Sequence, residues 1–136
     1  METEYRTAVA SLPAGRQVST DLADGGKKVE ILPEIPETEA ERRSKILPNA
    51  FPRKNPDLRV NGEYFEVKRP ENLTINAIDQ NIRKASHQAS NVIIIIENEM
   101  NLSTLESITK ERFDQHANLN KVIFYYQGKF YEFKRK

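Results

Sequence analysis

A helix-like segment followed at once by an uninterrupted apolar run constrains this fold most. From Thr74 to Ala89 the apolar residues recur every three or four positions, which places them on one face of a helix. Residues 92–96 are only Val and Ile, the composition of a strand buried on both faces. Because a strand at 63–68 precedes the helix, the three segments predict a β-α-β crossover with parallel strands. We therefore expect an α/β (α+β) protein with a mixed central sheet.

Two short turns predict β-hairpins. The Asn-Gly pair at 61–62 is the strongest short hairpin signal, and it joins predicted strands at 57–60 and 63–68. A Gln-Gly pair at 127–128 marks a second hairpin near the end of the chain. The remaining predicted elements are a helix at 16–24, a strand at 27–32, a helix at 102–114 and closing strands at 121–126 and 129–134.

The elements fit one domain over residues 1–136. Its core, at about 16–97, has the order α-β-β-β-α-β, and residues 98–136 add a helix and a hairpin. Residues 33–56 contain five prolines and predict a long irregular connection, with one or two helical turns at 37–45. A connection this long is more often functional or disordered than neutral.

Composition narrows the class of protein. The net charge is only +1, so the chain is not a bulk electrostatic binder of nucleic acid. It has no cysteine, which excludes disulfides, thiolate metal sites and a cysteine nucleophile. The acidic start is unlike a signal peptide, and the longest apolar run is too short to span a bilayer. A cytoplasmic protein without a membrane partner is expected.

The first hairpin carries the main chemical signal. If the Asn-Gly pair forms the loop, Asp57 faces Glu66 across the hairpin and Lys68 lies on the same face. Two carboxylates roughly 4.5–5.5 Å apart repel each other unless a positive charge compensates them. Mg²⁺ or Mn²⁺ would do so, because these ions favour oxygen ligands. The equally open alternative is a pair of exposed acids neutralised by Arg59 and Lys68.

The second hairpin is an internal control. It repeats the Glu-x-Lys pattern at Glu132 and Lys134, in nearly the same sequence context. By the same register Glu132 faces Ile123, so no second acid is present. The pattern alone therefore means little, and the opposed Asp57 distinguishes the first hairpin.

These residues carry a resemblance. Pro56-Asp57 followed by Glu66-Val67-Lys68, a helix and an apolar strand resembles the PD-(D/E)XK nuclease superfamily, with its restriction-endonuclease-like α-β-β-β-α-β core. The stretch "KKVEILPE…NPDLRVNGEYFEVKRPE…QASNVIIII" is similar in particular to C-terminal toxin domains of the CdiA contact-dependent inhibition family. The chain also resembles domains that occur at the ends of phage head-morphogenesis proteins. The resemblance covers roughly residues 16–97.

The resemblance implies roles for individual residues. Asp57, Glu66 and the backbone carbonyl of Val67 would bind Mg²⁺ or Mn²⁺, and Lys68 would orient or deprotonate the attacking water. A further acid is expected from the first helix or nearby, and we favour Glu34. The candidates are Asp21, Glu30, Glu34, Glu37 and Glu41.

Several polar residues near the acids could contact nucleic acid. Arg59 and Tyr64 could contact a base or a phosphate, with packing as the equal alternative. Lys84 and Gln88 lie on the polar side of the 74–89 helix. The alternative for both is that they belong to an ordinary solvated helix face. The two histidines, His87 and His116, are expected to be surface residues.

The resulting hypothesis is a metal-dependent endonuclease that cuts tRNA or other RNA in preference to DNA. As a toxin-like domain it would have a cognate immunity protein. One alternative is a catalytically inactive, phage-associated binding module with the nuclease fold. Another is a metal-independent ribonuclease of the barnase or EndoU-like type, with His87 or Lys68 as acid–base groups.

Overall fold

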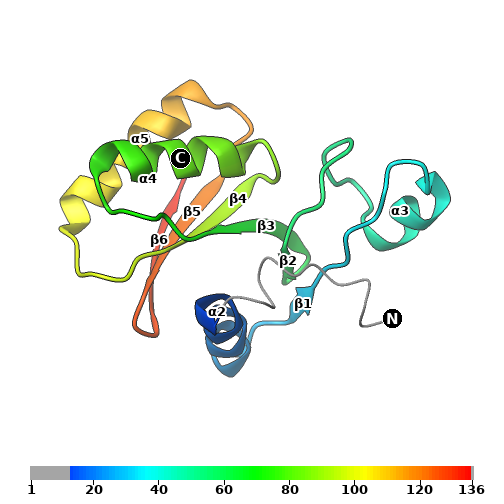
Figure 1. Cartoon of the computed structure of the whole chain (residues 1–136), viewed down its shortest axis with the longest axis horizontal. Helices are drawn as coiled ribbons and strands as arrows, with labels where there is room; N and C mark the ends of the chain where they lie inside the picture. Colours follow the sequence, from blue (N-terminus) through cyan, green and yellow to red (C-terminus); the bar gives the residue numbers. More distant parts are fainter. Residues whose placement is uncertain (1–12, 136) are drawn as a thin grey trace.

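Helices cover both faces of a six-stranded mixed sheet in the order β1-β2-β3-β4-β5-β6. The computed structural model describes residues 13–135, and the side chains of residues 17–135. Figure 1 shows α4 and α5 on one face, α2 on the other, and α3 beyond the β1–β2 end. The elements are α2 (Pro13–Asp24), β1 (Val29–Ile31), α3 (Ala40–Ile46), β2 (Leu58–Val60), β3 (Glu63–Lys68), α4 (Ile75–Ser86), β4 (Asn91–Ile95), α5 (Leu102–Gln115), β5 (Lys121–Tyr126) and β6 (Lys129–Lys134).

Both predicted hairpins are present. In the first, Asn61 and Gly62 have φ values of 49° and 85°, which is the left-handed backbone of a type I′ turn. The second turn repeats this geometry, with φ of 46° at Gln127 and 80° at Gly128. Their strands pair antiparallel, β2 with β3 and β5 with β6. The shared sequence of the two hairpins is therefore shared turn chemistry.

The predicted β-α-β crossover is confirmed, because β3 and β4 pair in parallel on either side of α4. Thr74 caps α4, its hydroxyl accepting a 3.1 Å hydrogen bond from the N–H of Ala77. The periodicity predicts that the helix continues to Ala89 and is ended by Asn91, but the helix ends at Ser86. The sheet explains the difference, because Asn91 is already paired with Phe65 at the start of β4.

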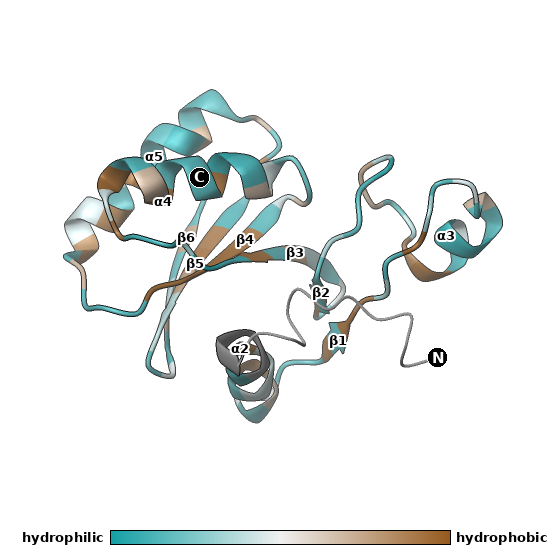
Figure 2. Ribbon diagram, in the orientation of Figure 1, coloured by the Kyte–Doolittle hydropathy of each residue, from teal (hydrophilic) through white to brown (hydrophobic). Residues whose placement is uncertain are grey.

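The core forms two apolar layers, one on each face of the sheet. Residues of α4 and α5 pack on one face around Ile94 and Phe124. On the other face, Val18 and Leu22 of α2 cover Phe65 and its neighbours. In Figure 2 the central strands are mostly hydrophobic, whereas α4 and α5 are largely hydrophilic. The run at 92–96 is buried throughout, as predicted, because β4 lies between β3 and β5.

The proline-rich connection is more ordered than predicted. It contains α3 at 40–46, about two helical turns, which agrees with the one or two turns expected at 37–45 apart from a small shift. Leu32, Ile35 and Leu47 form a small third core beneath it. Arg43 joins its parts through hydrogen bonds to the carbonyls of Ile35, Phe51 and Lys54 and to the side chain of Asn55, at 2.7–3.4 Å.

The other predicted elements are present with small shifts at their ends. The first strand is shorter than predicted, and the helix at 13–24 starts earlier than the expected residue 16. The closing strands at 121–126 and 129–134 match their predicted bounds. None of the described helices has the length and apolar character that crossing a membrane requires.

Candidate active site

Asp57 lies at the end of the connection, one residue before β2. Its N–H donates a 3.0 Å hydrogen bond to the carbonyl of Phe65, the residue that Leu58 already faces. Two residues therefore oppose one, which is the arrangement of a β-bulge. Bulges redirect side chains next to active sites, and this one turns a carboxylate that is only 1% exposed toward β3.

The bulge corrects the predicted pairing of Asp57 with Glu66. The expected register holds for the three pairs from Val60–Glu63 to Leu58–Phe65 and then stops. Instead, Asp57 Oδ2 accepts a 2.9 Å hydrogen bond from the N–H of Val67. The side chain thus takes the place of a backbone acceptor that β2 no longer supplies.

Glu66 and Lys68 follow on β3 with both side chains on the α4 face. Their partners in the parallel register are Val92 and Ile94, which belong to the core layer under α4. Glu66 is only 7% exposed, and its Oε2 lies 3.7 Å from Lys68 Nζ. We call Asp57, Glu66 and Lys68 the β3 acid site. The contact of Asp57 with Val67 places the three residues around the carboxyl end of β3.

The donor set of the β3 acid site suits a hard divalent cation. Across the described part of the chain, no three His, Cys, Asp or Glu side chains gather into a group that could hold a metal ion. Magnesium does not require such a group, because it binds through one or two carboxylates and keeps several waters. The Val67 carbonyl adds an oxygen, since the N–H and C=O of a strand residue face the same side.

A third acid is expected from upstream, with Glu34 as the favoured candidate. Glu34 is exposed, and its place in the β3 acid site stays a prediction. Each of the other four candidates has a partner outside the site. Asp21 accepts a hydrogen bond from the Tyr125 hydroxyl, Glu30 pairs with Arg59, Glu37 pairs with Arg53 and Glu41 pairs with Lys45.

The second hairpin confirms that Glu-x-Lys alone builds no such site. Glu132 faces Ile123, as the register predicts. Its carboxylate is 40% exposed and lies near two lysines, Lys134 at 3.4 Å and Lys121 at 3.7 Å. This is a solvated ion cluster on the last strand, whereas the Glu66 side chain is 9% exposed on an inner strand.

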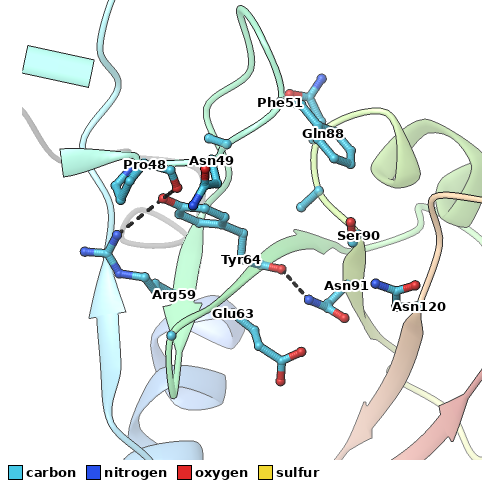
Figure 3. Close-up of a pocket in the computed structure, with 13 residues that line it drawn as sticks. Pro48, Asn49, Phe51, Arg59, Glu63, Tyr64, Gln88, Ser90, Asn91 and Asn120 are labelled. Carbon is cyan, nitrogen blue, oxygen red and sulfur yellow. Dashed lines mark hydrogen bonds between the residues drawn. The ribbon is translucent and has the colours of Figure 1, made fainter. Parts of the chain in front are cut away.

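A cavity of about 350 Å³ lies at the opposite end of β3 from the acid site. Three of the residues predicted to contact nucleic acid line it, namely Arg59, Tyr64 and Gln88. Figure 3 shows them converging from β2, β3 and the segment after α4. The fourth, Lys84, is exposed on α4 and does not line this cavity.

Arg59 also has the packing role that sequence left open. Its guanidinium forms a two-pronged ion pair with Glu30, at 2.7 and 3.1 Å, and donates to the Ile46 carbonyl at 2.9 Å. Hydrogen bonding to Arg59 lowers the pKa of Glu30, and the same contact raises the pKa of Arg59. Arg59 therefore ties β1, β2 and α3 together.

His87 is exposed, as predicted, and His116 is half-buried, but the two histidines contact each other. The rings of His87 and His116 meet edge to face with centroids 5.6 Å apart. Arg112 Nη1 lies 3.2 Å from His116 Nε2, and burial, followed by the charge of Arg112, lowers the pKa of His116. Sequence reasoning missed this contact because it joins the ends of two different helices.

The model of the family described as contact-dependent growth inhibition CdiA C-terminal domain matches residues 54–130, more than half of the chain. The chain belongs to this family. The match begins just before Asp57 and includes the β3 acid site.

A solved structure gives an independent view of the fold. It is the CdiA-CT/CdiI toxin and immunity complex from Burkholderia pseudomallei, which is similar with a TM-score of 0.63. The identity is 23%, over 90% of this chain and 82% of that one. A search of curated proteins found no match.

Proposed function

We propose that this chain is a toxin domain that hydrolyses phosphodiester bonds in nucleic acid, with RNA such as tRNA as substrate, through a divalent metal held by the β3 acid site. The observation that carries the proposal is the burial of the Asp57 and Glu66 carboxylates at one end of β3, beside Lys68. The family match and the resemblance of the Asp57, Glu66 and Lys68 pattern to PD-(D/E)XK nucleases support it.

Each residue of the site has a role in this proposal. Asp57, Glu66 and the Val67 carbonyl would hold Mg²⁺ or Mn²⁺. When bound, the ion lowers the pKa of water and polarises the phosphoryl oxygen. The ammonium of Lys68 is partly exposed, so it can reach a phosphate oxygen and stabilise the negative charge that develops there. The water oxygen would then bond to phosphorus while the P–O bond to the ester oxygen breaks. The water loses a proton and the leaving oxygen gains one, so the step balances.

A cognate immunity protein is the partner that we propose. The similar solved structure is a toxin and immunity complex, and a nuclease acting in the cytoplasm needs an inhibitor in the cell that makes it. A tight complex with such a protein would block cleavage of the nucleic acid.

The direct test is cleavage of total tRNA and of plasmid DNA, each with Mg²⁺, Mn²⁺ or EDTA. The second hairpin supplies a matched control, so Lys68→Ala is compared with Lys134→Ala. We expect metal-dependent cutting of RNA, lost in Lys68→Ala and retained in Lys134→Ala. Cutting that survives EDTA would contradict the proposal and point to the His87–His116 contact as the acid–base pair of a metal-independent ribonuclease.

A further inference from the structure

The cavity beside β3 has walls from five separate parts of the chain. They are the loop after α3, Arg59 of β2, the turn and start of β3, the segment from α4 into β4, and Asn120 before β5. Figure 3 shows Phe51 and Gln88 on one side, Tyr64 in the middle and Asn91 with Asn120 below. Its volume, about 350 Å³, lies at the small end of ligand pockets.

Two aromatic side chains line the cavity, and side-chain contacts hold the ring of Tyr64 in place. The Tyr64 hydroxyl donates a 2.6 Å hydrogen bond to the Pro48 carbonyl, and the Arg59 guanidinium lies 5.7 Å from the centre of the Tyr64 ring. Phe51 is half-buried, and Arg43 Nη2 contacts its carbonyl at 3.4 Å. Fixed aromatic faces are platforms for stacking an unpaired base.

Amide side chains supply the polar part of the lining. Asn91 is 4% exposed, and its Nδ2 donates a 2.9 Å hydrogen bond to the Tyr64 carbonyl. That contact fixes the amide, so Oδ1 points away from β3. Oδ1 is buried and has no hydrogen-bond partner in the structure. The Asn91 amide thus joins β4 to β3 at the cavity wall.

The charge of the lining argues against a phosphate as the occupant. Its one cation, Arg59, is engaged by Glu30, and the exposed Glu63 is ion-paired with Lys121 at 3.0 Å. The remaining polar residues include the uncharged amides of Asn49, Gln88 and Asn120. Asn49 stands at φ 63°, a left-handed conformation that asparagine tolerates, in the loop that forms the rim. Uncharged amides with aromatic faces suit a nucleobase.

We infer that this cavity binds one unstacked nucleobase of the nucleic-acid substrate, stacked on its aromatic rings and contacted by its uncharged amides. The inference rests on the proposed function, because it assigns a subsite to the same nuclease. Tyr64 and Glu66 are two residues apart on one face of β3, roughly 7 Å along the strand. A base held at Tyr64 would place its own sugar-phosphate near the β3 acid site.

Binding measured without cleavage tests the inference. Fluorescence anisotropy of a labelled single-stranded RNA in EDTA would compare the full chain with Phe51→Ala and Gln88→Ala. Loss of one stacking platform should weaken binding roughly tenfold or more. Gln80→Ala, on the exposed part of α4, is the matched control and should bind as the unchanged chain does. Phe51→Leu keeps an apolar side chain for folding but removes the ring, and should also bind weakly.

The outcomes separate this inference from the proposed function. If Phe51→Ala and Gln88→Ala bind RNA as tightly as the unchanged chain, the cavity is not a base site, even if metal-dependent cutting is seen. If the variants bind weakly but no condition gives cutting, the base site stands and the nuclease proposal fails.

Discussion

The Asp57 carboxylate accepts a 2.9 Å hydrogen bond from the backbone N–H of Val67, ten residues further along the chain. The contact closes the end of the β2–β3 pair, where the ladder between backbones has stopped. It also holds a nearly buried carboxylate next to Glu66. One side chain therefore completes the fold locally and shapes the β3 acid site.

Substitution of Asp57 should separate these two roles. Asp57→Asn keeps an oxygen that can accept from Val67, so the free energy of unfolding should stay close to that of the unchanged chain. Asp57→Ala leaves the Val67 N–H without its acceptor and should lower that free energy by about 1–3 kcal/mol. Both should lose cleavage. Urea unfolding followed by circular dichroism measures the stabilities, and equal values for the two variants would contradict the structural role.

Removal of the Arg43 side chain should loosen the connection at 33–56. Arg43→Ala loses the hydrogen bonds to Ile35, Phe51, Lys54 and Asn55, and should cost about 2–3 kcal/mol. Arg42→Ala, which removes an ion pair with Glu39 one turn of α3 away, should cost less than about 1 kcal/mol. Amide hydrogen exchange should rise around residues 47–56 in Arg43→Ala alone. Equal exchange in the two variants would contradict this role of Arg43.

The Glu30–Arg59 pair should stabilise the fold above the pKa of an ordinary glutamate. Hydrogen bonding to Arg59 lowers the folded-state pKa of Glu30, so the unfolded chain binds more protons in acid. The contribution is therefore present above about pH 4.5 and lost as the pH falls through the lowered value. The free energy of unfolding of Glu30→Gln should be about 1 kcal/mol lower at neutral pH, a figure reduced for solvent screening, and should fall less steeply in acid. If the free energy of unfolding of Glu30→Gln falls between about pH 6 and 3 as steeply as that of the unchanged chain, this account is contradicted.

His116 should make stability fall on mild acidification. Burial, and then the charges of Arg112, His87 and Arg83, lower its pKa, against the opposite effect of Asp79. The unfolded state then takes up the proton first, so this stability is complete above about pH 6.5 and is lost as the pH falls through the lowered folded-state value. His116→Gln should remove that loss between about pH 7 and 5. The measurement is the melting temperature of His116→Gln and of the unchanged chain across this pH range. Parallel pH profiles of the two proteins would contradict the lowered pKa of His116.

Local signals account for what could be predicted from sequence. The two Xaa-Gly turns fix the hairpins because their left-handed backbone is a property of the turn itself. The periodic apolar face of α4 and the run at 92–96 predict a buried parallel strand beside β3, and this was confirmed. The Glu66–Lys68 pairing on one face followed from simple alternation along β3.

Long-range contacts account for what sequence missed. The bulge at Asp57 depends on where the connection enters the sheet, which no pattern near Asp57 encodes. The order of that connection depends on Arg43, whose partners are mostly backbone carbonyls. The cavity was not predicted. Arg59, Tyr64 and Gln88 were singled out only as possible nucleic-acid contacts, and Phe51 and Asn120 join them through the tertiary fold.

Binding of a divalent ion to the β3 acid site is the most direct test of this account. Calorimetric titration with Mn²⁺ would compare the unchanged chain with Glu66→Gln and with Glu132→Gln, the equivalent change in the second hairpin. We predict one binding event in the unchanged chain and in Glu132→Gln, and its loss in Glu66→Gln. Binding that persists in Glu66→Gln, or is absent from all three proteins, would contradict the claim that Asp57 and Glu66 form a metal site.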